Sequence, residues 1–167
     1  EALVLGITGS NGKTTVKGLC ASILSRAGTC HVNAGNLNNE IGLPLSVLRM
    51  PAEVDYAVFE MGAGQPGDIA YLAGIAMPHI GLVNNVAPAH LARMGSVERV
   101  AETKGAIYAA LPPSGAAVIN ADDAFARRFE QIAAGRRIIQ FGLDRDADVT
   151  ADIESLGADG AQGDHHG

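Results

Sequence analysis

The sequence reads Thr8-Gly9-Ser10-Asn11-Gly12-Lys13-Thr14-Thr15 between an apolar run, 2–7, and a segment with helical periodicity. A strand, a glycine-containing loop and a helix in this order form the setting of a phosphate-binding loop, because glycines let consecutive N–H groups face one anion. The lysine of such a loop reaches the terminal phosphates, and the hydroxyl after it binds Mg²⁺. Ile7 stands where the longer pattern G-x-x-x-x-G-K-[ST] has glycine, so the match is to the shorter T-G-x-x-G-K-T-T. We therefore predict a nucleotide phosphate site at Gly9, Ser10, Asn11, Gly12, Lys13, Thr14 and Thr15.

Composition limits the possible partners. The chain has 167 residues, 47% of them hydrophobic, enough for one domain with a core. Its net charge is −6 and it has no basic run, which disfavours nucleic acid as a partner. No apolar stretch reaches the length of a membrane span, and no signal-peptide pattern is present. We expect a cytoplasmic monomer that binds no membrane, with Cys20 and Cys30 as reduced structural thiols.

Apolar runs alternate with helical patterns along most of the chain. We expect strands at 2–8, 29–33, 55–59, 79–84, 116–119, 137–141 and 149–153. We expect helices at 16–27, 44–50, 66–76 and 96–111 and from about 124 to 134, with a loop at 85–93. Since most of the expected strands are continuously apolar, the fold class is α/β, a mostly parallel sheet covered by helices on both faces.

Several polar residues directly follow expected strands and should share the carboxyl edge of the sheet. Glu60 ends one strand, where a carboxylate can hold Mg²⁺ beside Thr14, although a strand-end acid can also simply face solvent. His90 lies in a strand-end loop near the expected phosphates, and alone it reads as a hydrogen-bonding loop residue. Asn120 could contact a base edge through its amide, which is a weak signal by itself.

Two helices carry apolar stripes. In the helix after the phosphate loop, Lys17 lies off a stripe formed by Val16, Leu19, Cys20, Ile23, Leu24 and Ala27. In the helix at 96–111, Lys104 lies within the stripe and so faces the sheet. A lysine there snorkels to the helix margin or needs an acid, a phosphate or a chemical modification, and periodicity alone leaves these alternatives open.

The asparagine-rich segment 35–44 is either a turn-rich connector or a substrate loop, and composition alone does not decide between them. The final residues, 157–167, show no periodicity and are expected to form a loop after a domain that occupies 1–156. His165 and His166 are assigned to that loop and to no metal site.

These pieces, in this order, resemble the Mur ligase family, the ATP-dependent amide-forming enzymes of peptidoglycan synthesis. The matching segments lie within residues 2–123: the phosphate loop at 8–15, GNLNNEIGLPL at 35–45, FEMGA at 59–63 with GDI at 67–69, NVAPAHL at 85–91, Gly95-Ser96, Lys104-Gly105, and NADD at 120–123. The asparagine-rich segment and the NVAPAHL series are most similar to members that add D-alanyl-D-alanine to UDP-MurNAc-tripeptide. Ala92 and Ala106 depart from the acidic residues expected at those positions in close relatives.

The resemblance implies a role for each candidate residue. Lys13 and the loop amides hold the ATP phosphates, and Asn120 lies near the adenine. Thr14 and Glu60 bind a first Mg²⁺, while His90 and a carbamate formed from CO₂ on Lys104 bind a second. Lys13, His90 and Lys104 are thereby the catalytic residues, and Asn36 and Asn39 lie toward the nucleotide-sugar peptide.

The resemblance also implies a reaction. The γ-phosphate of ATP passes to the terminal carboxylate of the tripeptide substrate, and the amine of D-Ala-D-Ala attacks the resulting acyl phosphate. The family's N-terminal UDP-sugar domain and C-terminal domain are not in this sequence, and the central domain looks incomplete at its end, so we expect no turnover from these 167 residues alone. Three alternatives stay open: another Mur ligase, a folylpolyglutamate synthetase, and a regulatory phosphate-loop NTPase.

Overall fold

The computed structural model describes residues 2–88, 91–151, 155–157 and 160–162. Its main sheet has six strands in the order β2-β3-β1-β4-β5-β6, and every neighbouring pair is parallel. The strands are β1 Leu3–Thr8, β2 Cys30–Val32, β3 Tyr56–Glu60, β4 Ile80–Val83, β5 Ala116–Asn120 and β6 Arg137–Phe141. The predicted parallel α/β sheet is therefore confirmed.

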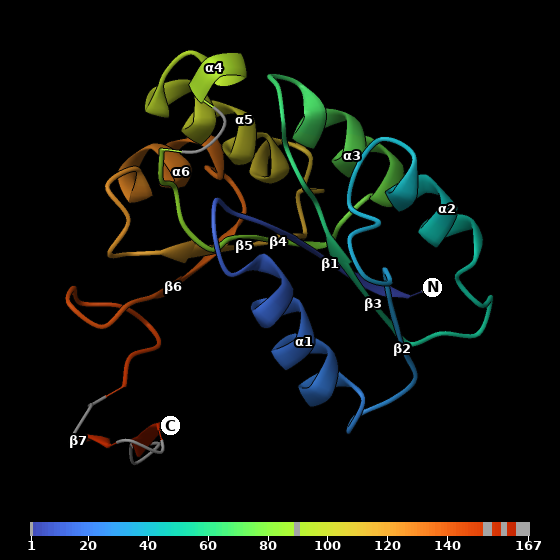
Figure 1. Cartoon of the computed structure of the whole chain (residues 1–167). Coiled ribbons are helices and arrows are strands. Elements are labelled where there is room, and N and C mark those ends of the chain that lie inside the picture. Colours follow the sequence, from blue (N-terminus) through green and yellow to red (C-terminus); the bar gives the residue numbers. More distant parts are fainter. Residues whose placement is uncertain (1, 89–90, 152–154, 158–159, 163–167) are drawn as a thin grey trace.

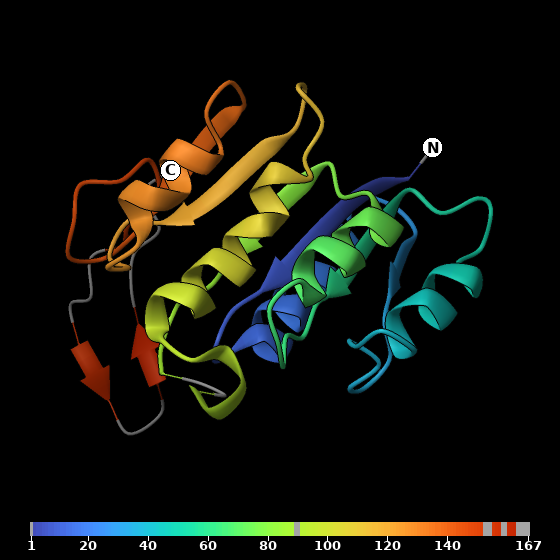
Figure 2. The ribbon, with the colours of Figure 1, turned by 90° about the horizontal axis from the view of Figure 1, so that it is seen from above.

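Helices lie on both faces of this sheet (Figure 1). The helix α1 (Lys13–Leu24) lies on one face, and the other carries α2 (Gly42–Leu48), α3 (Asp68–Ala76), α5 (Val97–Ala109) and α6 (Ala126–Ile132). Seen from above, α5 and α3 run side by side across the sheet (Figure 2). Ser96 begins α5 as expected, because its hydroxyl accepts a hydrogen bond from the Arg99 amide at 3.3 Å. No described helix is both long and apolar enough to span a membrane.

The connections place a crevice at the carboxyl edge. From β1 the chain passes through α1 to β2, at one edge of the sheet. From β3 it passes through α3 in the opposite direction to β4, on the other side of β1. Such a reversal of direction opens a space beyond the strand ends, where parallel α/β sheets bind their ligands. The loops that follow β1, β3 and β4 therefore meet there.

The core is uneven on the two faces. A large apolar cluster lies under α2, α3, α5 and α6, and its largest members are Phe59, Tyr108 and Phe129. A smaller cluster under α1 contains Ile7, Val58 and Leu82.

The apolar stripe predicted for α1 is wrong in part. Val16, Cys20 and Leu24 pack on the sheet, but Leu19 is 60% and Ile23 68% exposed. Residues spaced by four form one narrow row along a helix. A helix lying alone on a wide sheet touches it with that row only, which leaves the adjacent apolar positions in solvent.

Two other segments differ from expectation. The loop expected at 85–93 ends in a single helical turn, α4 (Leu91–Met94), and the expected terminal loop contains part of a small antiparallel pair, β7 (Ser155–Gly157) with β8 (Gly160–Gln162). Elements of three or four residues are too short to show a period in the sequence. Of the strand expected at 149–153, Val149 makes an isolated bridge to Phe141, and 152–154 lie outside the described residues.

Candidate nucleotide and metal site

The phosphate-binding loop connects β1 to α1 in the predicted way. Gly12 caps α1 with a left-handed backbone, φ 74°, and an added Cβ there would lie 2.9 Å from Asn84 Nδ2. The left-handed conformation therefore favours glycine here, and a Cβ would also require the end of the Asn84 side chain to move. Lys13 Nζ donates to the Gly9 carbonyl at 2.9 Å, within the loop. The free N–H groups at the start of α1 remain available to an anion.

The loop after β4 holds the phosphate loop in place. The Ser10 amide donates to the Asn85 carbonyl at 3.0 Å, and the Ser10 hydroxyl exchanges hydrogen bonds with the Ala87 backbone. The Asn11 amide donates to Asn85 Oδ1 at 2.9 Å. These bonds cross more than 70 residues of chain, so the asparagines after β4 support the loop.

Glu60 lies at the end of β3, where the sequence predicted it, and it faces the start of α1. Thr14 donates its hydroxyl proton to Glu60 Oε2 at 2.9 Å, and Asn38 donates to Glu60 Oε1 at 2.8 Å. The residue is only 3% exposed. Burial by itself raises the pKa of Glu60, but the bonds from Asn38 and Thr14 and the charge of Lys17 outweigh it and bring the pKa below its usual value. The carboxylate is therefore ionised at neutral pH.

Lys17 is buried, which the sequence pattern did not predict. Its Nζ donates to the carbonyls of Asn33 at 2.9 Å and Gly35 at 3.2 Å, and it lies 3.3 Å from Glu60 Oε2. Lys17 lies off the apolar stripe of α1, and an amphipathic pattern assigns such a position to solvent. The one available signal was its spacing: Lys17 follows Lys13 by four residues, so both lie on one face of α1.

Lys104 is 3% exposed on α5, as its place in the apolar stripe predicted. No described residue pairs with its ammonium group. Burial, and next the charge of Lys13, lower the pKa of Lys104 from 10.5 to about 8. A buried amine beside another cation is stabilised by an anion, or by losing its proton.

The asparagine-rich loop contributes to the same place through a residue that the sequence did not single out. Asn38 bonds to Glu60, and the Gly62 amide donates to the Asn38 carbonyl at 2.7 Å. Asn39 uses its side-chain oxygen to accept the Gly42 amide at the start of α2. Asn36 is exposed.

Asn120 lies at the end of β5, as expected, with its amide already bonded. Its Nδ2 donates to the Asn84 carbonyl at 3.0 Å, and its Oδ1 accepts the Asp122 amide at 3.0 Å. The neighbouring Asp123 accepts the Val86 amide at 2.7 Å. These residues join the ends of β5 and β4. His90 lies outside the described residues.

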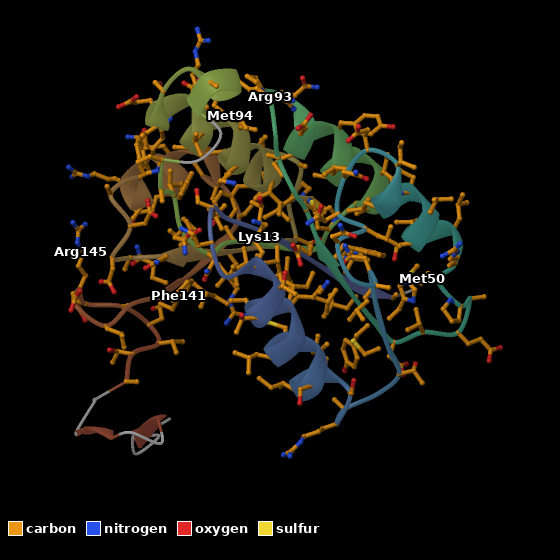
Figure 3. All side chains as sticks on the ribbon, in the orientation of Figure 1. Lys13, Met50, Arg93, Met94, Phe141 and Arg145 are labelled. Carbon is orange, nitrogen blue, oxygen red and sulfur yellow. The ribbon has the colours of Figure 1, made fainter. Side chains whose placement is uncertain are left out.

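A cavity of about 590 Å³ opens beside some of these groups. It is lined by Gly9, Ser10, Lys13, Asn38, Asn39 and Lys104, together with Asp68 from α3 and Arg93 from α4. Figure 3 shows Lys13 at the start of α1 and Arg93 near the N-terminal end of α3. Lys13 from α1 thus meets Arg93 from α4 and Lys104 from α5 in one space, and this group of cations suits a polyanionic ligand.

Comparisons with known proteins show which family the chain resembles. Residues 7–164 match the model of the Mur ligase middle domain. The Escherichia coli protein named UDP-N-acetylmuramoyl-tripeptide--D-alanyl-D-alanine ligase is 44% identical over 140 residues, which cover 84% of this chain and 31% of that protein.

Two solved structures are also similar. The crystal structure of MurF from Acinetobacter baumannii superposes with a TM-score of 0.87 at 35% identity, covering 96% of this chain and 37% of that one. MurF ligase from Thermotoga maritima, solved in complex with ADP, has a TM-score of 0.79 at 34% identity and covers 91% of this chain and 35% of that one. This chain thus spans about a third of the length of these relatives.

Proposed function

Because this chain belongs to the Mur ligase family, whose middle domain it matches over residues 7–164, we propose that it is the ATP-binding part of a longer ligase. The reaction would join D-alanyl-D-alanine to UDP-MurNAc-tripeptide, the reaction named for its relative from Escherichia coli. We place this reaction in the cytoplasm, where ATP is available. The single observation that carries the proposal is the cavity that the phosphate loop and the buried Lys104 line together, with the Thr14–Glu60 pair joined to its wall through Asn38.

The residues present fit a magnesium ion at the first of the two proposed positions. Thr14 Oγ1 and Glu60 Oε2 are hard oxygen donors 2.9 Å apart, and the lowered pKa of Glu60 keeps its carboxylate charged. The described residues contain no group of three His, Cys, Asp or Glu side chains that could hold a metal ion. The remaining ligands of this first Mg²⁺ would be phosphate oxygens and water. A bound Mg²⁺ would supply positive charge for the transferring phosphoryl group.

Lys104 fits the proposed carbamate. A buried lysine whose pKa is about 8 has a neutral fraction at physiological pH, and only the neutral amine attacks CO₂. Loss of the ammonium proton gives the neutral amine, and its attack on CO₂ forms the N–C bond, breaks one C–O π bond and releases a second proton, so a buried cation becomes a carboxylate. We propose that this carbamate and His90 hold a second Mg²⁺, although His90 lies outside the described residues.

The chain's own groups then serve the first chemical step. Lys13 releases the Gly9 carbonyl and turns to the β- and γ-phosphates, where its charge stabilises phosphoryl transfer to the tripeptide carboxylate. ADP and an acyl phosphate result, and the D-Ala-D-Ala amine displaces phosphate with loss of one proton. We propose that Asn36 and Asn39 face the nucleotide-sugar peptide and that Asn120 lies near the adenine.

The test is made on the complete ligase that contains this domain. ATP consumption should require both UDP-MurNAc-tripeptide and D-Ala-D-Ala, and the 167-residue chain alone should form no amide. ATP hydrolysis that is indifferent to both substrates would indicate a regulatory NTPase instead, and ligation of glutamate to folate would indicate the synthetase alternative.

A pair of lysine variants tests the carbamate. Lys104→Ala should lose activity and regain part of it with added acetate or propionate, because a short carboxylate can replace the carbamate. Lys13→Ala is the matched control, and carboxylate should not restore it because the missing group is a cation. Equal rescue of both variants, or of neither, would contradict the assignment.

A further inference from the structure

Lys17 occupies a junction between three parts of the molecule that the proposed reaction must bring together. It lies on α1, four residues after Lys13, and the residue as a whole is 6% exposed. Its contacts reach the start of the asparagine-rich loop through Asn33 and Gly35, and the end of β3 through Glu60. None of the proposed catalytic roles uses this residue.

The contacts match the chemistry of an ammonium group. A lysine carries three N–H donors around one centre. Here two of its partners are backbone carbonyls and the third is a carboxylate, so the buried charge is both hydrogen-bonded and neutralised. A buried cation with fewer partners would be costly.

The same stretch of loop is fastened to β3 at two further points. The Asn33 side chain accepts the Glu60 amide at 2.9 Å and donates to the Glu60 carbonyl at 3.0 Å. It also donates to the Leu37 carbonyl at 2.9 Å, and Asn38 returns to the Glu60 carboxylate. The loop therefore closes into a ring around Glu60, and Lys17 joins that ring to α1.

We propose that Lys17 is a positioning residue. It holds residues 33–39, which lead into and begin the asparagine-rich segment, at a fixed place relative to Glu60 and the phosphate loop. Asn38 and Asn39 line the cavity, so the position of these residues sets the shape of a cavity that Lys13 and Lys104 also line. The ligand affected is the nucleotide-sugar peptide, and this part of the inference rests on the proposed function. The KM for ATP should change less than the KM for the nucleotide-sugar peptide, because Lys17 bonds to no phosphate-loop backbone group in the described structure and reaches the proposed metal position only through Glu60.

Hydrogen exchange on the ligand-free chain tests the placement without any activity. The amides of Leu37, Asn38 and Gly62 report on the loop, since each donates a hydrogen bond within it or to it. In Lys17→Met these three amides should exchange about tenfold faster or more, because the loop loses its charge-assisted hydrogen bonds to α1 and opens more often. The amide of Val16, which bonds to Gly12 at the start of α1, should keep its rate.

Two further variants keep this measurement decisive. Arg26→Met removes an exposed cation just after the same helix and should change none of the four rates. Lys17→Gln retains donors for the carbonyls without the charge and serves if the methionine variant does not fold. Unchanged exchange at Leu37, Asn38 and Gly62 in a folded Lys17 variant would overturn the proposal.

Kinetics of the complete ligase test the consequence for the substrate. Lys17→Met should raise the KM for UDP-MurNAc-tripeptide about tenfold and raise the KM for ATP by clearly less, and Lys17→Arg should restore part of the loss. An equal rise in both KM values would mean that Lys17 only stabilises the fold. If the wild-type ligase does not use the nucleotide-sugar peptide, the proposed function fails, whereas the exchange result still decides the placement of the loop.

Discussion

The buried amine of Lys104 should make the stability of this domain depend on pH in a defined way. Lys104→Met removes the titrating group and keeps an unbranched side chain in the same apolar stripe of α5. The pKa of Lys104 falls from 10.5 in an exposed chain to about 8 in the folded one. At about 1.4 kcal/mol per pKa unit, this difference corresponds to about 3 kcal/mol of unfavourable free energy for the charged form. Because Lys104 is 3% exposed, solvent screens little of this cost.

The sign follows from which state binds the proton more tightly. Between about pH 8 and pH 10.5 the unfolded chain holds a proton on this lysine that the folded chain has released. The free energy of unfolding therefore rises with pH through this window and is level on either side of it, as far as this group is concerned. Below about pH 8 the buried charge of Lys104 lowers the free energy of unfolding by its full amount, and above pH 10.5 it no longer lowers it.

Urea denaturation of the wild type and Lys104→Met across this range is the direct assay. Buffers free of CO₂ keep the lysine unmodified. The methionine side chain also adds buried apolar surface, which changes the free energy of unfolding of the variant by the same amount at every pH. The test is therefore how the difference between the two free energies of unfolding changes with pH. The free energy of unfolding of Lys104→Met minus that of the wild type should fall by about 3 kcal/mol from neutral pH to about pH 11.

Arg99→Met is the matched control for this assay, since Arg99 is an exposed cation on the same helix. Its curve should run parallel to that of the wild type throughout the range. If the Lys104→Met and wild-type curves were also parallel, Lys104 would titrate like an exposed lysine, and the argument for a neutral amine that reacts with CO₂ would fail.

Two buried hydroxyl groups should respond to removal in opposite directions. Thr8 Oγ1 is the one buried side-chain polar atom without a partner among the described residues, so Thr8→Val should stabilise the ligand-free chain by about 1–2 kcal/mol in urea denaturation. Tyr108 instead accepts the Val83 amide at 3.1 Å and donates to the Val118 carbonyl at 2.8 Å, so Tyr108→Phe should destabilise it by about 1–3 kcal/mol. Changes of the same sign in both variants would contradict these hydrogen-bond assignments.

The sheet and the phosphate loop could be predicted because their signals are local. A continuous apolar run, a glycine loop and a helical period each lie within a few residues of sequence, and the carboxyl-edge rule then placed Glu60 beside Thr14. The 2.9 Å contact between these two side chains confirms that proximity. Lys104 was likewise predicted to face inward from its position in a stripe.

Lys17 and Asn38 could not be identified in the same way, because their partners are distant in sequence. The burial of Lys17 depends on two loop carbonyls and on Glu60, 43 residues away by sequence number. Periodicity describes how one helix meets an apolar surface, and α1 meets a polar junction at this point. The same limit explains Leu19 and Ile23, whose exposure depends on the absence of a neighbouring described helix on that face.

The chain contains three lysines and nine arginines, and all three lysines lie at the candidate site. Each position uses a property that arginine lacks. Lys13 is a compact cation that fits inside the phosphate loop, and Lys17 arranges three donors around a single nitrogen. Lys104 must give up its proton, which an arginine in a protein does not do. Arginine should therefore fail at 104 through its permanent charge and at 13 through its size, whereas at 17 it should retain part of the function because charge and several donors remain.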